Sequence, residues 1–175
     1  MHFMKNLIFI GGIHGVGKGT LCNKISNETN LTHLSSSSLV KWVEISSRQN
    51  KKVQNIYNTQ KRLLLGLEKE VKENKNYILD GHFCLLNHKN IPTNVPFETF
   101  EKINPKGIMV VCEDINTIYK RLNKRDNLSY SIELLKEFQK KEIARAREVS
   151  KRLEVEFFLF KNNFNEAINY INNTL

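Results

Sequence analysis

The stretch GGIHGVGKGT, residues 11–20, constrains the fold of this chain more than any other. Gly12 is followed by four residues and then by Gly17 and Lys18, which is the spacing of a loop that binds phosphate through backbone N–H groups. Glycine lets the backbone approach an anion closely, and a lysine at this place can reach the β and γ phosphates of a nucleotide. The usual loop has Ser or Thr directly after the lysine, whereas Gly19 stands there in this chain.

The residues on either side of the loop predict that it joins a buried strand to a helix. NLIFIGG (6–12) is a short apolar run that ends in glycines, and GKGTLCNKISNET (17–29) places Leu21 and Ile25 on one helical face. The dipole of such a helix adds positive potential where the backbone N–H groups of residues 15–19 converge. A glycine-rich turn without a ligand is the alternative, but the order of strand, loop, Lys-Gly-Thr and helix favours a phosphate site.

Strand and helix signals alternate along the rest of the chain. Strands are predicted in 6–12, in 31–38 (a weaker strand or a loop), and in 76–82, 107–114 and 155–160; helices are predicted in 17–29, 39–49, 53–73, 115–126, 131–153 and 164–175. The segment 87–96 holds two of the three prolines and is interpreted as a loop. This alternation predicts an α/β fold of the three-layer P-loop NTPase type, with a five-stranded parallel sheet flanked by helices. We expect residues 1–175 to form one domain.

The longest predicted helix, 131–153, has an apolar stripe along one side. The stripe contains Leu135, Phe138, Ala146, Val149 and Leu153. These residues lie along one side of the predicted helix, as on a helix that buries one face.

Net charge narrows the class of partner. Lys and Arg number 27 against 18 for Asp and Glu, which gives a net charge of +9. Such a balance fits an anionic partner, whether a nucleotide, a nucleic acid or an acidic surface. Lys, Asn and Ile are all abundant, and a biased genome would enrich the three together, so part of the charge can be compositional drift.

The spacing of the cysteines and the length of the apolar runs indicate the cellular compartment in which the protein works. Cys22, Cys84 and Cys112 are far apart and lack C-x-x-C spacing, which argues against a disulfide framework or a zinc site. The longest apolar runs fall short of the roughly 18 residues of a membrane span. The sequence therefore predicts a reducing, cytoplasmic setting and no membrane partner.

The loop resembles that of adenylate kinase and its nucleoside monophosphate kinase relatives, in which a Gly-Lys-Gly-Thr ending is usual. The resemblance implies ATP and Mg²⁺ as cofactors, with space for the phosphates beside Gly19 and with the metal held largely through water. His14 stands where the family commonly has proline, and it either contacts phosphate or forms part of the loop's wall. The expected nucleotide-binding residues are Gly12, His14, Gly15, Val16, Gly17, Lys18, Gly19, Thr20 and Leu21.

YILDGHFCLLN (77–87) resembles the third strand of the same family, which ends in an aspartate followed by glycine. The resemblance implies that Asp80 lies beside the phosphate loop and accepts hydrogen bonds from magnesium waters, so that Thr20 and Asp80 are the candidate metal residues. A simple cap or turn residue is the alternative for Asp80. The Phe-Pro-Arg run of well-known members is absent after His82, which leaves the substrate open.

EDINTIYKRLNKRDN (113–127) resembles the lid of this family, in which two arginines separated by three residues close over the donor phosphates. Arg121 and Arg125 match that spacing and share one face of a helix. The expected lid, 114–130, is too short for an inserted sheet or zinc domain, so the compact adenylate kinases are the best match. A solvated basic helix is the alternative interpretation. Two later arginines, Arg145 and Arg147, are further candidates for the site.

The family binds its monophosphate after the second strand, where LSSSSLVKWVEISSR (34–48) stands in this chain. We therefore expect residues 38–73 to form the acceptor-binding helical segment. The serines either contact phosphate or cap the helix that begins near Leu39. The candidate acceptor residues are Ser35, Ser36, Ser37, Lys41 and His82, with Arg48 and Arg62 as alternatives to Lys41.

These features predict an ATP-dependent phosphotransferase that moves the γ-phosphoryl group to a small phosphorylated acceptor, with a nucleoside monophosphate as the favoured one. Phosphoryl transfer depends mainly on alignment and electrostatic stabilisation, for which Lys18, Arg121 and Arg125 are the expected catalytic residues. Two alternatives remain. One is a kinase or ATPase that acts on nucleic acid ends, which the net charge favours; the other is a nucleotide-binding regulatory module with low turnover.

Overall fold

A parallel sheet forms the centre of the molecule, as the computed structural model shows for residues 6–40, 56–125 and 130–175. Its strands are β1 (Leu7–Gly11), β2 (Thr32–Ser35), β3 (Tyr77–Asp80), β6 (Gly107–Val111) and β7 (Glu156–Phe160). They lie in the order β2-β3-β1-β6-β7, and every neighbouring pair is parallel. The predicted five-stranded parallel sheet is confirmed.

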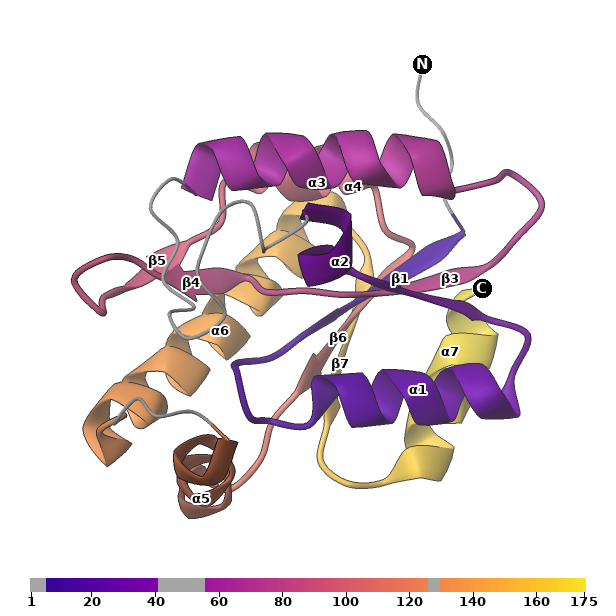
Figure 1. The fold of residues 1–175 in the computed structure, drawn as a ribbon. Helices are drawn as coiled ribbons and strands as arrows, with labels where there is room; N and C mark the ends of the chain where they lie inside the picture. The colour runs from indigo at the N-terminus through magenta and orange to yellow at the C-terminus, as the bar shows by residue number, and fades with distance from the viewer. Residues whose placement is uncertain (1–5, 41–55, 126–129) are drawn as a thin grey trace.

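Helices cover both faces of this sheet (Figure 1). They are α1 (Lys18–Glu28), α2 (Ser36–Val40), α3 (Ile56–Glu70), α4 (Phe97–Ile103), α5 (Ile115–Arg125), α6 (Ile132–Leu153) and α7 (Phe164–Thr174). Helices α1 and α7 lie on one face, and α3 and α4 lie on the other (Figure 1). In the described part of the chain, no helix is both long and apolar enough to cross a bilayer.

Alternation along the strands builds a core on each side of the sheet. On β1, Ile8 and Ile10 belong to the apolar cluster beneath α1, whereas Leu7 and Phe9 belong to the cluster beneath α3 and α4. Successive side chains of a strand point to opposite faces, so a strand buried on both sides reads as a continuous apolar run. This explains why LIFI is apolar throughout.

The segment between β3 and β6 differs from the prediction. Residues 87–96 were expected to form a loop, but β4 (Cys84–Leu86) and β5 (Pro92–Asn94) pair as an antiparallel hairpin, and α4 follows directly. The Asn87 side chain accepts hydrogen bonds from the backbone N–H groups of Lys89 and Ile91 and so closes the turn. Both strands have only three residues, and β5 begins with a proline, so their alternation of apolar and polar residues is too short to detect from sequence.

The carboxyl ends of β1, β3 and β6 lie side by side at one edge of the sheet. Ligands bind at this edge in open α/β sheets, because the connections that leave the strands diverge there. The sheet therefore brings together the loop after Gly11, the turn after Asp80 and the segment after Val111.

Candidate functional site

The phosphate loop runs from β1 into the first turn of α1. Gly15 and Gly17 have φ angles of +79° and +99°, a conformation that side chains rarely adopt. Gly17 is the N-cap of α1 and makes no side-chain cap, so the first N–H groups of the helix are available to an anion. The buried Lys18 side chain turns back, and its Nζ donates to the carbonyl of Gly12 at 2.7 Å.

A cleft of about 770 Å³ opens above this loop. Most of the sequence-predicted residues line it: His14, the loop residues 15–21, Ser35, Ser37, Asp80, Arg121 and Arg125. The far end is formed by the β7–α7 connection, where Lys24 Nζ lies 3.9 Å above the ring of Phe164. The structure thus collects in one place residues that are more than 100 positions apart in the sequence.

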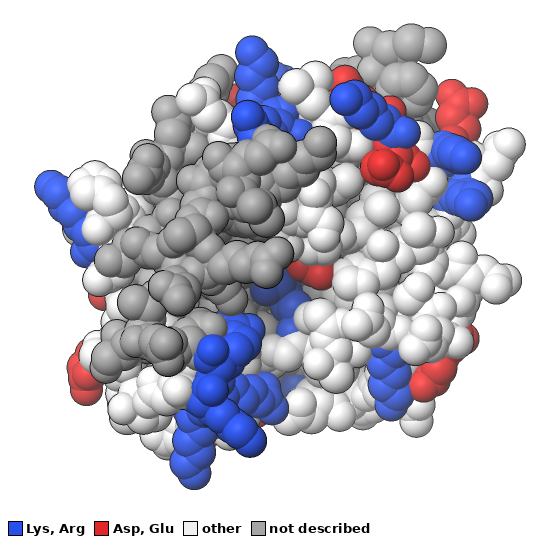
Figure 2. All heavy atoms as spheres, in the orientation of Figure 1, with Lys and Arg blue, Asp and Glu red and all other residues white. Residues whose placement is uncertain are grey.

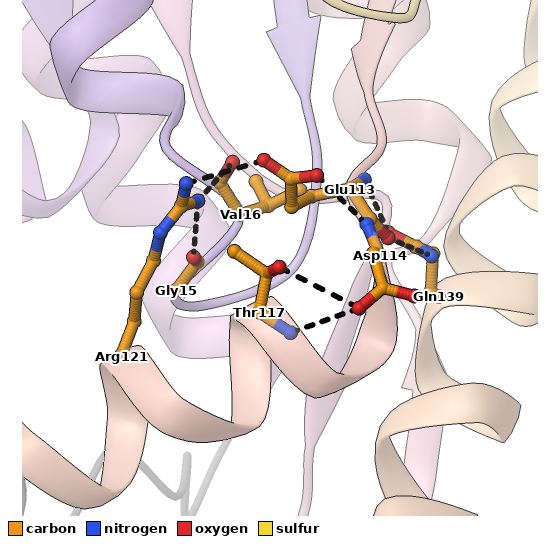
Figure 3. A network of polar contacts seen from close by, with 7 residues as sticks. All are labelled: Gly15, Val16, Glu113, Asp114, Thr117, Arg121 and Gln139. Atoms are coloured by element: carbon orange, nitrogen blue, oxygen red, sulfur yellow. Dashed lines mark hydrogen bonds and ion pairs between the residues drawn. The ribbon is translucent and has the colours of Figure 1, made fainter.

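Helix α5 lies against the phosphate loop through apolar contacts and through polar contacts, and Figure 3 shows the polar ones. The Arg121 guanidinium donates to the carbonyls of Gly15 and Val16, each at 3.3 Å, and pairs with Glu113 at 3.2 Å. Beneath it, a Cβ placed on Gly15 would lie only 2.8 Å from the Cγ of Leu122. A glycine is therefore required there for α5 to approach the loop.

The connection from β6 to α5 is fixed by a side chain of α6 (Figure 3). The Gln139 amide donates to the carbonyl of Glu113 at 3.0 Å and accepts from its N–H at 3.1 Å. Asp114 in turn accepts from the backbone N–H of Thr117 at 3.1 Å and so caps α5. These contacts orient the acidic residue that holds Arg121.

Basic side chains gather over α5 on the face that Figure 2 shows. Lys120, Arg121, Lys124 and Arg125 are all exposed on this helix. Only the two arginines line the cleft, because they lie one turn apart on the face toward the loop. The helix is thus a solvated basic surface with one face turned to the phosphate loop.

Asp80 contacts a histidine that the sequence motifs did not point to. His33 Nε2 lies 2.6 Å from Asp80 Oδ2, and its Nδ1 lies 3.0 Å from Asn23 Oδ1. The ligand atoms of Cys22, His33 and Asp80 lie within 4.8 Å of one another, a grouping that could hold a metal ion. Burial, with a smaller contribution from Asp80, raises the pKa of Cys22 to about 12, so its thiol is protonated at neutral pH.

Oxygen ligands suited to Mg²⁺ are also present in the cleft. The Asp80 carboxylate and the Thr20 hydroxyl line the same space beside the phosphate loop. Mg²⁺ prefers such hard oxygen ligands and keeps several waters, so this pair fits the metal better than a set that requires a buried protonated thiol.

The acceptor-side candidates are divided between two places. Ser35 and Ser37 line the main cleft, and their hydroxyl oxygens are 2.8 Å apart. Ser36 and His82 instead line a separate buried cavity of about 20 Å³ beneath α3 and α4, together with Thr59, Gln60 and Thr99. The His14 and His82 rings are in contact, with centroids 4.5 Å apart, so the two places adjoin.

The remaining basic candidates give different results. Lys41 and Arg48 lie outside the described residues. Arg145 donates to the carbonyl of Val95 at 2.9 Å and pairs with Glu148, and Arg147 lies over the ring of Phe157. Neither Arg145 nor Arg147 lines the cleft, because both project from the part of α6 that packs beyond it.

Sequence reasoning missed Glu142 of α6, which is fully buried at the base of the site. Its carboxylate accepts from the backbone N–H groups of Gly12 at 2.8 Å, Phe83 at 2.9 Å and Cys84 at 2.6 Å. Burial raises the pKa of this carboxyl, against the opposing effect of these hydrogen bonds and of Lys18. A signal existed in the sequence, because Glu142 fills the gap between Phe138 and Ala146 in the apolar stripe of the helix.

Comparisons with known proteins agree with this arrangement. Residues 11–139 match the model of the family described as AAA domain. No curated protein matches the chain in a sequence search.

Two solved structures resemble the chain over nearly its whole length. A gluconokinase from Sinorhizobium meliloti 1021 is 9% identical, with a TM-score of 0.53, over 98% of this chain and 91% of its own. A shikimate kinase from Acinetobacter baumannii in complex with shikimate is 12% identical, with a TM-score of 0.60, over 98% and 95%. At these identities the likeness establishes a shared fold, that of the P-loop kinases.

Proposed function

The chain belongs to the AAA domain family, and on that premise we propose that it is an ATP-dependent phosphotransferase acting on a small acceptor. The observation that carries the proposal is the convergence of Lys18, the first turn of α1 and two arginines on one cleft. Backbone N–H groups, an ammonium and two guanidiniums together provide the electrostatic stabilisation that phosphoryl transfer needs.

The donor nucleotide is proposed to occupy the cleft lengthwise. Its phosphates lie on residues 12–20, where Lys18 exchanges the carbonyl of Gly12 for a phosphate oxygen. Its nucleoside end extends toward Asn162 of the β7–α7 connection and Phe164 at the start of α7, which line the same cleft. The presence of both the phosphate loop and these residues in the lining of the cleft supports this orientation.

Asp80, at the carboxyl end of β3, and Thr20, beside the phosphate loop, are the residues that we propose would hold Mg²⁺, in large part through water. When bound, the metal would neutralise charge on the β and γ phosphates. His33 keeps the Asp80 carboxylate in a fixed orientation from the side away from the cleft.

The acceptor is proposed to lie beside Ser35 and Ser37, and a nucleoside monophosphate is the favoured one. Both hydroxyls line the cleft next to Asp80, within reach of the phosphate loop. Lys41 remains the predicted contact for the acceptor phosphate. The two kinases of similar fold are named for gluconate and shikimate, so small hydroxy acids belong among the acceptors to be tested.

Arg121 and Arg125 are proposed to clamp the migrating phosphoryl group. Arg121 already bonds to the loop carbonyls that face the cleft, so a small movement of its guanidinium brings it onto phosphate oxygens. Arginine suits this role because its planar fork contacts two oxygens together. Closure of α5 also excludes water, which would otherwise hydrolyse ATP.

A kinase that acts on nucleic acid ends is the second candidate. The exposed Lys120 and Lys124 of α5 favour it, because basic side chains gather over this helix and could contact a phosphate backbone (Figure 2). Binding of this kind weakens steeply as salt rises, whereas binding of a small acceptor does so far less.

ADP formation from ATP–Mg²⁺ tests the proposal directly. Each nucleoside monophosphate, gluconate, shikimate and a 5′-hydroxyl oligonucleotide are added separately to the same enzyme. We expect slow turnover with ATP alone and acceleration by orders of magnitude with one small acceptor. Acceleration by the oligonucleotide alone favours the second candidate, and no acceleration by any acceptor contradicts a phosphotransferase for these classes.

A further inference from the structure

Three backbone N–H groups, from two segments of the chain, meet at one carboxylate beneath the phosphate loop. We propose that Glu142 is a positioning residue, whose carboxylate fixes the spacing between the phosphate loop and the segment after β3 that carries His82. Through this spacing, and through the contact of the His82 ring with His14 of the cleft, it aligns the donor phosphates with the acceptor, a role that rests on the proposed function.

The hydrogen bonds of Glu142 join two parts of the chain that are distant in sequence. Oε1 accepts from the N–H of Gly12 at 2.8 Å and from that of Phe83 at 2.9 Å. Oε2 accepts from the N–H of Phe83 at 3.0 Å and from that of Cys84 at 2.6 Å. Because Oε1 is shared, a displacement of either segment must strain or break a bond to the other.

Gly12 is held from both sides by side chains. Its N–H donates to the Glu142 carboxyl group, and its carbonyl accepts from Lys18 Nζ at 2.7 Å. Burial raises the pKa of Glu142, and the nearby Lys18 opposes this effect. The residue that begins the phosphate loop thus lies between a buried carboxyl group and the cation that is to contact phosphate.

Packing alone does not account for a carboxylate in this place. The neighbours of Glu142 along the same stripe, Phe138, Ala146 and Val149, are buried apolar side chains. A buried carboxylate is costly unless it is fully hydrogen-bonded, whereas an apolar residue would pack without that cost. The carboxylate orients its backbone N–H partners through hydrogen bonds, which an aliphatic side chain cannot do.

Transfer is far more sensitive to this spacing than simple nucleotide binding is. A misplacement of about 1 Å between reacting groups lowers rates on the order of 10²-fold. ATP hydrolysis without acceptor does not need the segment after β3. A loss of spacing therefore reduces transfer much more than hydrolysis, whereas general destabilisation reduces both alike.

Glu142→Gln tests this inference, because it keeps the size of the side chain but turns an N–H₂ group toward backbone donors. Glu137→Gln, at an exposed position of the same helix, is the matched control. We expect Glu142→Gln to lower acceptor-dependent transfer roughly 10²-fold, by the same sensitivity to misplacement, and acceptor-free hydrolysis much less. Amide NMR shifts of Gly12, Phe83 and Cys84 should move together, while those of the control keep their parent values.

The outcomes separate the two proposals. Equal losses of transfer and hydrolysis, or unchanged transfer with shifted amides, overturn the positioning role. If the parent enzyme transfers to no acceptor, the proposed function fails, and unchanged amide shifts in Glu142→Gln would then overturn the spacing as well. If Glu142→Gln does not fold, Glu142→Asp, which keeps the charge but withdraws the carboxylate, gives the same two readouts.

Discussion

The phosphate loop is supported from two sides by contacts of different kinds. On its lower side, Glu142 and Lys18 bind Gly12 through buried bonds of 2.8 and 2.7 Å, respectively. On its upper side, Arg121 contacts the loop and Glu113 at 3.2–3.3 Å, and nearly half of the arginine side chain is exposed.

This difference in burial implies that the contacts on the two sides differ in how easily a side chain can leave its protein partner for a ligand. Exposed ion pairs contribute only about 0–1 kcal/mol, so Arg121 can leave Glu113 for a phosphate oxygen at little cost. Breaking a buried charged hydrogen bond is far more costly, because water does not replace the lost partner. The lower side of the loop is therefore a fixed base, in which Lys18 leaves the Gly12 carbonyl only for a phosphate oxygen, and the upper side is a cover that adjusts to ligand.

Lys18→Ala, in the fixed base, should have the largest effect on transfer. Loss of one preorganised electrostatic donor costs about 3 kcal/mol of transition-state stabilisation, on the order of 10²-fold or more in rate. Single-turnover transfer with ATP–Mg²⁺ measures it, with exposed Lys120→Ala as the control and circular dichroism to confirm the fold. An unchanged rate in Lys18→Ala would contradict the assignment of the phosphate loop.

Arg125→Lys, in the adjustable cover, should lower transfer while leaving ATP affinity nearly intact. Lysine keeps the charge but loses the fork that contacts two oxygens, so we expect a loss of roughly 10²-fold, as with arginine fingers. Lys124→Arg on the same helix is the control. Transfer at the parent rate in Arg125→Lys would show that α5 is only a solvated basic surface.

Gly15→Ala and Gly19→Ala should affect stability in opposite directions. Gly15 has φ +79° and faces Leu122 of the cover, so an added methyl group should destabilise the protein by about 1–3 kcal/mol. Gly19 lies in α1 with open space around it, and alanine there should stabilise by about 0.5–1 kcal/mol. Urea denaturation of both variants measures the difference; equal effects would mean that α5 does not pack on the loop.

Alkaline pH should destabilise the fold, because two buried cysteine thiols and a buried tyrosine hydroxyl have raised pKa values. Burial raises the pKa of Cys22 and Cys84 from 9.0 to about 12 and that of Tyr170 from 10.0 to about 12. The unfolded chain thus loses these protons first, so the free energy of unfolding should fall as pH rises from about 9 to 12. Urea denaturation across this range measures it, and Cys22→Ala should flatten the slope; a slope that the variant leaves unchanged would exclude Cys22 as a contributor.

Sequence predicted the features that depend on local pattern. The loop, its strand and its helix lie within about 20 consecutive residues, and their glycine spacing and apolar runs are visible without any tertiary knowledge. The arginines of α5 were expected from the resemblance of the segment to the kinase lid, and helical periodicity places residues four apart on one face. Both sets of residues line the cleft.

The parts that escaped prediction depend on contacts between distant residues. Glu142 meets Gly12 across 130 positions, and His33 meets Asp80 across 47. The periodicity of apolar residues in a sequence does not indicate from which backbone N–H group a buried carboxylate will accept a hydrogen bond. The β4–β5 hairpin was missed for a different reason, since strands of three residues give almost no alternating signal.

The fate of the γ-phosphoryl group tests the central claim most directly. ATP labelled in that group is followed through a single turnover with parent enzyme, Mg²⁺ and each small acceptor, and the products are separated. The account predicts that the label appears on one acceptor, with little inorganic phosphate, and that Lys18→Ala transfers almost none. Label found only in inorganic phosphate, whichever acceptor is present, would contradict the account and make the protein a nucleotide hydrolase.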